Sequence, residues 1–280
     1  MLSKKYLAIK MILKKLSKFK FLNQKFYTLA NMYLDIEKGY RFSYHPDENG
    51  EVELLCSLSK IYGGQIFNFF DVGAHFGEYT DLLISQFQSY RGWLFDLSDE
   101  TLLKCRLKHS QNKYLVINHL GLNDSKGVVE YRFYPELQVQ NGISGVGPYI
   151  GHNFELRRAP SITGDQYCLD NNINQIHLLK IDTEGYDLNV LRGFDRMLSK
   201  NKIDIIQFEY NIKSSETHSM LGDFYKYLLQ YDYVIGPLRQ DGVKFRDFEF
   251  TQNDFRSGPN YIACKPKLKT KLSSFTKKDL

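Results

Sequence analysis

Short apolar runs alternate with amphipathic stretches through most of the chain, and this alternation is the main indication of its fold. After each run, apolar residues tend to recur every three or four positions, as they do in helices. The strand-like runs cover residues 67–72, 92–96, 114–118, 176–182, 203–210, 233–235 and 261–264. Strands that alternate with helices predict a mostly parallel sheet with both faces covered.

The stretch between the third and fourth runs has a different pattern. Residues 128–133 alternate between two sets of side chains, which is typical of an antiparallel or edge strand. Residues 135–163 contain four glycines and three prolines, and we expect a long loop there. Because long loops in compact domains are usually functional or mobile, this one is a candidate for part of a substrate site. Its Arg157 and Arg158 are the residues we would test.

Four of the predicted core strands end in an acidic residue. These residues are Asp71, Asp96, Asp182 and Glu209. A single acid at a strand end is usually a cap or a turn residue. The carboxyl ends of parallel strands meet at one edge of the sheet, where ligands bind, so four acids there predict a functional rim.

The turn after the first of these strands carries two glycines, Gly73 and Gly77, ahead of a predicted helix. Backbone without a Cβ approaches a ligand closely. A P-loop would need Gly-Lys-Ser/Thr at the helix start, but Glu78 follows Gly77, and a dinucleotide fingerprint would need a third glycine. S-adenosylmethionine (SAM) carries an ammonium and a sulfonium, which suit the acid at the strand end. An ordinary tight turn is the alternative at this point.

Charge is segregated along the 280 residues, although the net charge is only +5. The first 30 residues carry eight lysines and no acid, and residues 265–280 carry six lysines against one acid. The body between them is therefore acidic, which argues against nucleic acid as a partner. The four cysteines lie far apart, with no C-x-x-C pair, as expected of reduced thiols in a cytoplasmic protein.

Residues 3–34 mix apolar side chains and lysines at helical spacing. Such a helix either lies on an anionic membrane surface or packs on the body or on another subunit. No apolar run reaches the ~20 residues of a membrane span, and lysines interrupt every run that could form a signal peptide. We therefore expect a cytoplasmic protein, and its basic N-terminal helix is a candidate for peripheral membrane contact.

Several motifs occur in a distinctive order. They are residues 71–77 (DVGAHFG), 94–96 (LFD), 118–124, 163–165, 179–187 (LKIDTEGYD), 190–193 (VLRG) and 206–210 (IQFEY). In order and spacing they resemble the FkbM family of class I SAM-dependent methyltransferases over roughly residues 50–265. The resemblance implies a Rossmann-like class I methyltransferase sandwich, with a mostly parallel seven-stranded sheet and helices on both faces. It implies SAM as the cofactor. We expect a basic N-terminal extension over 1–50, the methyltransferase domain over 51–265 and a basic tail over 266–280.

The resemblance also assigns roles to individual residues. Asp96 would bind the ribose hydroxyls of SAM, and Asp124 would lie near the adenine amino group. Asp182 would face the ammonium or the substrate. The expected cofactor-binding residues are Asp71, Gly73, His75, Gly77, Asp96 and Asp124.

Three residues depart from the usual family pattern. His75 stands in place of Asn, Leu97 in place of Pro, and Gly164 in place of Leu. The role of His75 near the cofactor is therefore open. None of the three changes removes an acid of the rim.

Methyl transfer to a hydroxyl needs positioning and a base that takes the proton. The candidate catalytic residues are Asp182, Glu184 and Glu209. Histidine also titrates near neutrality, so His75, His119 and His152 are alternatives by chemistry. The acids at 182, 184, 187 and 209 could instead hold Mg²⁺, although we predict no metal. We expect an O-methyltransferase acting on a sugar, a glycan or a related small metabolite. The alternative is a non-catalytic SAM-binding or scaffold protein on a membrane-associated glycan-synthesis complex.

Overall fold

The computed structural model describes residues 10–15, 18, 20–37, 46–135, 153–255 and 260–275. Met1–Phe42 and Ser43–Leu280 form two compact units. The first unit contains helical residues 10–15 and helix α2 (Lys20–Glu37). In the described part of the chain, no helix combines the length and the apolar character needed to cross a membrane. The predicted domain boundaries near residues 50 and 265 stay predictions.

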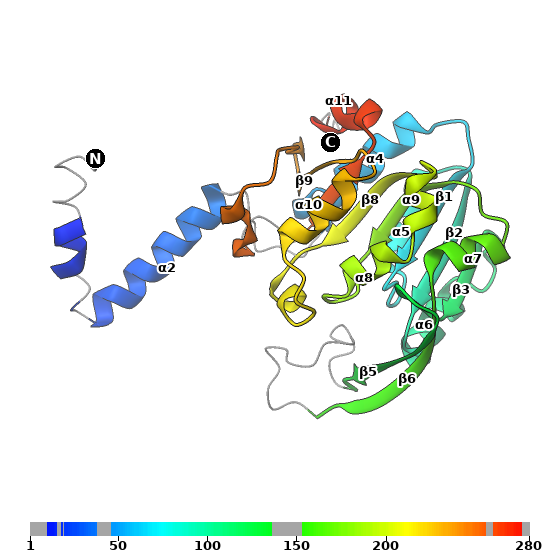
Figure 1. Cartoon of the computed structure of the whole chain (residues 1–280), viewed down its shortest axis with the longest axis horizontal. Helices are drawn as coiled ribbons and strands as arrows, with labels where there is room; N and C mark the ends of the chain where they lie inside the picture. The colour runs from blue at the N-terminus through cyan, green and yellow to red at the C-terminus, as the bar shows by residue number, and fades with distance from the viewer. Residues whose placement is uncertain are drawn as a thin grey trace. The chain divides into compact units, whose positions relative to one another are not determined.

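The second unit is built on a large sheet (Figure 1). Its strands lie in the order β10-β9-β11-β8-β7-β1-β2-β3. In chain order they are β1 (Phe67–Val72), β2 (Tyr90–Asp96), β3 (Leu115–His119), β7 (Ile176–Ile181), β8 (Ile203–Glu209), β9 (Val234–Arg239), β10 (Gly242–Val243) and β11 (Asn260–Cys264).

The five strands from β3 to β8 in this order run parallel, and β11 pairs antiparallel with β8 and with β9. The predicted mostly parallel seven-stranded sheet is thus confirmed, with β10 added at the edge as an eighth strand of two residues.

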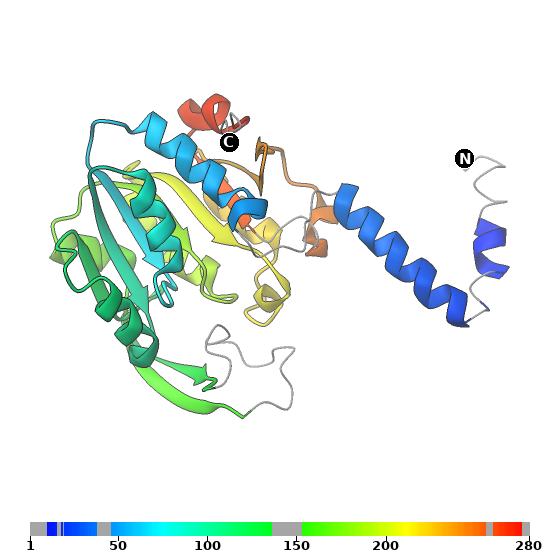
Figure 2. The same cartoon turned by 180° about the vertical axis from the view of Figure 1, so that it is seen from behind.

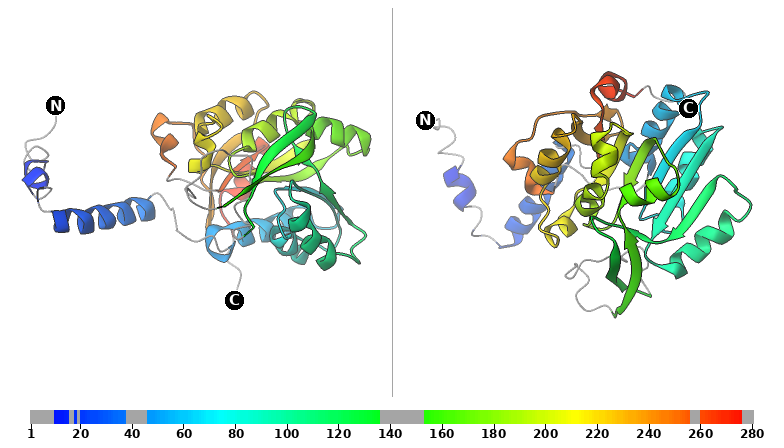
Figure 3. Two further views of the ribbon diagram at one scale, coloured as in Figure 1. Left: turned by 90° about the horizontal axis from the view of Figure 1, so that it is seen from below. Right: turned by 45° about the vertical axis from the view of Figure 1, so that its right-hand side comes forward.

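Side chains point alternately to the two faces of the sheet along each strand, and helices cover both faces. Phe69 of β1 packs into a core shared with α4, α5, α6 and α11, whereas Phe70 packs into a core shared with α7, α8, α9 and α10. Figure 2 shows α4, α5 and α6 in front of the sheet, and the left view in Figure 3 shows helices on its two sides. These helices are α4 (Glu51–Ile61), α5 (Glu78–Gln86), α6 (Asp99–Lys108), α7 (Gly164–Asp170), α8 (Asp187–Arg192), α9 (Asp195–Ser199), α10 (Leu221–Leu229) and α11 (Lys269–Leu272).

A second sheet is inserted between β3 and β7. Its order is β4-β6-β5, from β4 (Gly121–Leu122), β5 (Gly127–Phe133) and β6 (Glu155–Ile162). β5 and β6 form a long antiparallel pair, so the alternating pattern of 128–133 was interpreted correctly. The predicted loop over 135–163 is wrong for residues 155–162, and residues 136–152 lie outside the described residues. The backbone N–H of Asn123 donates to the carbonyl of Ile162 (3.0 Å), which joins the two ends of the insertion.

Shorter helices complete the second unit. The first is α3 (Pro46–Asn49). The others are the 3₁₀ helices η2 (Ile212–Ser215), η3 (Phe250–Asp254) and η4 (Pro266–Leu268). α3 and α4 place residues at the rim of the sheet, where the strands β1, β2 and β7 end.

Candidate active site

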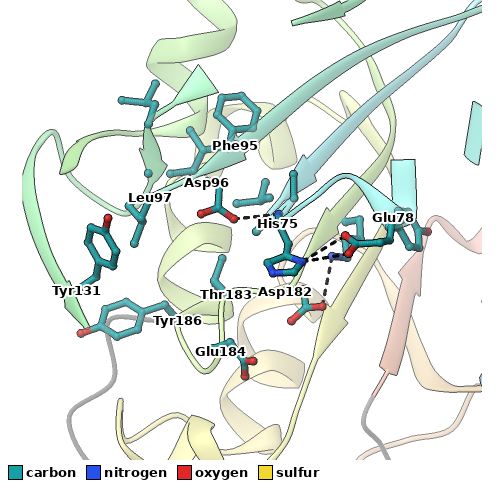
Figure 4. Close-up of a pocket in the computed structure, with 18 of the residues that line it drawn as sticks. His75, Glu78, Phe95, Asp96, Leu97, Tyr131, Asp182, Thr183, Glu184 and Tyr186 are labelled. Atoms are coloured by element: carbon teal, nitrogen blue, oxygen red, sulfur yellow. Dashed lines mark hydrogen bonds and ion pairs between the residues drawn. The ribbon is translucent and has the colours of Figure 1, made fainter. Parts of the chain in front are cut away.

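A cavity of about 370 Å³ opens at the carboxyl ends of β1, β2 and β7, and its volume is in the usual range for small-molecule sites (Figure 4). Its lining contains residues from both sheets and from the helices α4 and α5. The lining residues are Pro46, Glu51, Val72, Gly73, Ala74, His75, Glu78, Tyr79, Leu82, Phe95, Asp96, Leu97, Leu120, Gly121, Leu122, Val129, Tyr131, Lys180, Asp182, Thr183, Glu184 and Tyr186.

The turn between β1 and α5 forms one wall of this cavity, and its backbone is unusual. Gly73, His75 and Gly77 all have positive φ, at 80°, 51° and 82°. A Cβ on Gly73 would overlap the backbone carbonyl oxygen of Asp182, which follows β7. The N–H of Asp182 also donates to the carbonyl of Val72 (2.9 Å). Gly73 is therefore needed both for its left-handed backbone and for the close approach of two strand ends.

The positive φ at residue 75 gives a physical reason for the Asn that the resemblance leads us to expect there. Asn is among the few side chains that tolerate the left-handed region, and His shares this tolerance to a lesser degree. His75 therefore fits the turn without a change of backbone. The change affects which chemical group reaches the cavity, and not the path of the chain.

Asp96 ends β2 and lies within the cavity. Its Oδ2 accepts from the N–H of His75 (3.0 Å) and its Oδ1 from the N–H of Ser98 (2.9 Å). Burial raises the pKa of Asp96, while these two N–H groups and the nearby His75 favour its charged form. Each oxygen keeps a further lone pair, so the carboxylate has acceptors for two hydroxyl groups of a ligand.

Three of the predicted cofactor residues, Asp71, Gly77 and Asp124, do not line the cavity. Asp71 is fully buried beneath the turn, where it accepts from the hydroxyl of Thr80 (2.7 Å) and lies 3.4 Å from the ammonium of Lys180. Asp124 is exposed and accepts from the amide of Asn189 (3.3 Å). Neither side chain lines the cavity. Asp71 therefore supports the site from below, and the contact of Asp124 with adenine stays a prediction.

The residues after β7 form the opposite wall. Asp182 is half-exposed toward the cavity, and its Oδ2 lies 3.3 Å from the ammonium of Lys180. Glu184 has positive φ (56°) and is paired with Lys213 of η2 at 2.6 Å. Burial, followed by the charge of Asp182, raises the pKa of Glu184, although Lys213 opposes this. A carboxyl in such a setting takes up a proton more readily than an ordinary surface carboxylate.

Two more carboxyls lie behind this wall. Asp187 accepts from the N–H of Glu209 (2.9 Å) and from the N–H and hydroxyl of Thr183 (3.2 and 2.8 Å). Burial, with the charge of Asp182, raises the pKa of Asp187 to about 7, and burial raises the pKa of Glu209 well above its usual value. Glu209 does not line the cavity, so its predicted catalytic role stays a prediction. Among the described residues, no group of three or more His, Cys, Asp or Glu side chains is arranged to hold a metal ion.

Lys180 is a site residue that the sequence reasoning quoted as part of a motif without a role. It lines the cavity, and its ammonium lies between Asp71 and Asp182. Burial favours the neutral amine, but the carboxylates of Asp182, Asp71 and Glu51 outweigh it and raise the pKa of Lys180. The register places Lys180 directly opposite Asp71, so the pairing of β1 and β7 determines this contact.

Glu51, the first residue of α4, was also missed. It accepts from the amides of Gln207 (2.6 Å), Asn49 (2.9 Å) and Asn260 (3.3 Å), and burial raises its pKa. Gln207 in turn accepts from the hydroxyl of Tyr79 (2.8 Å). Glu51 is 129 positions before Lys180 in sequence, and no local pattern indicates that both reach one cavity.

The remaining wall is apolar and is contributed largely by the inserted sheet. Its side chains are Leu97, Leu120, Leu122, Val129 and Tyr131. Such a wall suits the flat, weakly polar face of a heterocycle such as adenine. The alternation along residues 128–133 indicated that Val129 and Tyr131 point to the same side of their strand. It did not show which part of the molecule that side contacts.

Residues 71–235 match the methyltransferase FkbM domain family, which is more than half of the chain. The chain belongs to the FkbM methyltransferase family. It is therefore a SAM-dependent methyltransferase, and SAM is its cofactor. No curated protein sequence matches the chain.

Solved structures with a similar chain path are distant from this FkbM protein. An rRNA methylase from Streptococcus thermophilus has 9% identity over 76% of this chain and 92% of its own, with a TM-score of 0.38. M. capricolum TrmK, in complex with S-adenosyl-homocysteine, has 9% identity over 76% and 66%, with a TM-score of 0.40. The precorrin-6y C5,15-methyltransferase of Geobacter metallireducens has 10% identity over 76% and 86%, also with a TM-score of 0.40. At this level of similarity they say nothing about the acceptor.

The cavity of this FkbM protein fits SAM in the chemistry of its walls. Asp96 offers paired acceptors for a ribose diol, the apolar wall suits adenine, and the turn at Gly73 brings bare backbone to the center. Asp182 and Lys180 supply opposite charges at the other end, where a zwitterionic amino-acid group would lie. When bound, SAM supplies an electrophilic methyl group.

Proposed function

We propose that this methyltransferase methylates a hydroxyl group of a sugar, a glycan or a related small metabolite. The observation that carries the proposal is the wall formed by Asp182 and Glu184, which lies in the same cavity as the Gly73 turn. A hydroxyl must lose its proton as it attacks a methyl group, and a carboxylate in the cavity is a suitable base. Glu184, with its raised pKa, is the stronger candidate. Asp182, which lies between the turn and Glu184, would orient the ligand groups (Figure 4).

The charge of the cavity supports a neutral acceptor rich in hydroxyls. Its acidic lining residues outnumber the basic ones, since Lys180 is the only lysine or arginine among the described lining residues. The acids are Glu51, Glu78, Asp96, Asp182 and Glu184. Carboxylates accept hydrogen bonds from hydroxyl groups, but they repel the phosphates of a nucleic acid. We therefore favour a glycan or small-molecule acceptor over RNA or DNA.

The proposal is tested with methyl-labelled SAM and a panel of neutral glycosides, alongside tRNA and rRNA. We expect label on a hydroxyl acceptor, and we expect Glu184→Gln to lower kcat by about 10²-fold or more, as loss of a general base does. The Kd of SAM, measured by titration calorimetry, should change little. Glu130→Gln is the matched control, because Glu130 pairs with Arg158 on β5–β6 outside the cavity. Label on RNA, or unchanged kcat in both Glu184→Gln and Asp182→Asn, would contradict the proposal.

The same calorimetry separates catalysis from the alternative, a SAM-binding scaffold without turnover. The scaffold would bind SAM and transfer no methyl group to any member of the panel. Asp96→Asn provides the reference for lost cofactor binding, because it removes one charge from the carboxylate that would hold the ribose. The full set of carboxyls in the cavity favours an enzyme.

We also propose that the N-terminal unit contacts anionic membrane surfaces and that the protein is cytoplasmic. Large apolar side chains of α2 are exposed, including Phe26, Leu29 and Tyr33 on one helical stripe. The eight lysines of the first 30 residues complement an anionic lipid surface. Sedimentation with phosphatidylserine vesicles should exceed that with phosphatidylcholine vesicles, and Lys-to-Gln changes at positions 10, 14 and 15 should weaken it at least about tenfold. Equal sedimentation with both vesicles would contradict the membrane contact.

A further inference from the structure

His75 has an unusual position in the active site, because one nitrogen of its ring has a partner and the other has none. Its backbone N–H donates to Asp96, and its Nδ1 lies 3.3 Å from both carboxylate oxygens of Glu78. Its Nε2 is buried and has no hydrogen-bond partner. In Figure 4 the ring projects from the Gly73 turn into the space bounded by Asp96, Thr183 and Asp182.

An unpartnered polar atom that is buried in a ligand cavity indicates a ligand group, since leaving it unpaired costs free energy. We propose that the imidazolium form of His75 donates a hydrogen bond from Nε2 to the carboxylate of the amino-acid end of SAM, while Glu78 holds Nδ1. This rests on SAM as the cofactor and is independent of the identity of the methyl acceptor.

Donation from Nε2 requires the charged ring. Glu78 accepts the hydrogen of Nδ1, so Nε2 carries a hydrogen only when the ring is charged. The hydrogen bond that His75 forms with Glu78 helps to lower the pKa of Glu78, although burial opposes it, so Glu78 is a carboxylate at neutral pH. Asn, the residue expected at this position, also has an N–H group to donate. Donation is thus the property that Asn and the His imidazolium share.

The charged groups beside His75 in the cavity are Glu78 of α5, Asp96 of β2 and Asp182 after β7, and all three are acidic. Lys104 of α6 lies over the ring of the neighbouring Phe76, with its ammonium 4.3 Å from the center of that ring. A SAM carboxylate in this acidic setting needs a positively charged hydrogen-bond donor. Lys180 is the other cation that lines the cavity, and its ammonium already lies between Asp71 and Asp182.

The consequence is a cofactor affinity that depends on pH. The hydrogen bond is present while both ring nitrogens of His75 carry a hydrogen, and it is lost when the ring gives up a proton, so it weakens toward alkaline pH. We expect the Kd of SAM to rise about tenfold more between pH 6 and pH 8.5 in the wild type than in His75→Asn, the difference between a charged and a neutral hydrogen bond. The comparison is necessary because the ammonium of SAM titrates in the same range.

The experiment is calorimetric titration of two ligands into the full-length wild type and His75→Asn at pH 6, 7 and 8.5. Asn tolerates the left-handed backbone at residue 75, so the variant should keep its fold, which circular dichroism checks. The second ligand is 5′-methylthioadenosine, which lacks the amino-acid end. Its affinity should have the same pH dependence in both proteins. If His75→Asn is unstable, Glu78→Gln serves instead and should also reduce the pH dependence for SAM.

Three outcomes would overturn the proposal. Equal pH dependence of the Kd of SAM in wild type and His75→Asn would show that His75 Nε2 does not donate to the SAM carboxylate. If the Kd of 5′-methylthioadenosine also depends more strongly on pH in the wild type than in His75→Asn, His75 contacts the adenosine part of the cofactor instead. The same Kd of SAM for the wild type and His75→Asn at all three pH values would show that the side chain at residue 75 does not contact the cofactor.

Discussion

The two walls of the cavity bind by different means. On the β1–β2 side, the turn of Gly73, His75 and Gly77 acts largely through backbone shape and N–H groups, with Asp96 as its fixed acceptor. On the β7–β8 side, the chemistry lies in side chains whose pKa values are shifted by burial and by one another, as for Glu184 and Asp187. The first wall suits recognition of one constant ligand. The second suits proton transfer, and its properties depend on charges that single substitutions change.

The largest expected effect is on the backbone wall. Gly73→Ala should lower the free energy of unfolding by about 3 kcal/mol or more, because the new Cβ overlaps the carbonyl of Asp182 and φ is 80°. The matched control is Gly64→Ala, with φ of 86° and no atom within 4 Å of the added Cβ. It should cost only about 1 kcal/mol. Urea unfolding measures both, and equal losses would mean that the contact between the two walls is unimportant.

A smaller effect concerns pH and the side-chain wall. Folded Asp187 holds its proton up to about pH 7, whereas the unfolded side chain releases it near 3.8. Between these values the folded state binds more protons, so its stability falls as the pH rises. Urea unfolding at pH 5 and 7.5 should show a greater loss in the wild type than in Asp187→Asn. Asn keeps one of the two acceptor oxygens, so the variant is less stable throughout. The prediction would be contradicted if the free energy of unfolding changed equally between pH 5 and pH 7.5 in the wild type and in Asp187→Asn.

The smallest effects are expected outside both walls, at the arginines for which the sequence suggested a role in acceptor binding. Arg157 lies 3.6 Å over the ring of Phe133 and pairs with Glu100 and Glu155, so Arg157→Ala should cost about 1 kcal/mol of stability. Arg158 is 76% exposed, and Arg158→Ala should change stability by less than about 0.5 kcal/mol. Neither lines the cavity, so the acceptor KM should stay unchanged in both. A raised KM would restore the original prediction.

The backbone wall was predictable because its signals are local. An apolar run, two glycines and a following helix lie within twenty residues, and the acid of the next strand follows from the same pattern. The mostly parallel pairing of the strands followed from their alternation with helices. Asp71 shows the limit of this reasoning. The register of the strands decides whether a residue at a strand end points beneath the turn or into the cavity, and the sequence does not show the register.

The side-chain wall was only partly predictable. Asp182 and Glu184 were found from their position after a strand, but the pairing of Glu184 with Lys213 and the reach of Glu51 into the cavity depend on distant segments. The strand β6 was missed because its outward side chains are polar and its partner β5 is separated from it by a stretch rich in glycine. Both failures concern contacts between residues far apart in the chain.

The inserted sheet enters and leaves the fold at neighbouring points, since Asn123 and Ile162 are joined by a backbone hydrogen bond. An insertion whose ends meet is a replaceable part: it can be lengthened, shortened or exchanged while β3 and β7 keep their places. Because this part also supplies Val129 and Tyr131 to the cavity, exchange of the segment 124–161 between homologous proteins offers a direct route to engineered ligand preference on an unchanged catalytic frame.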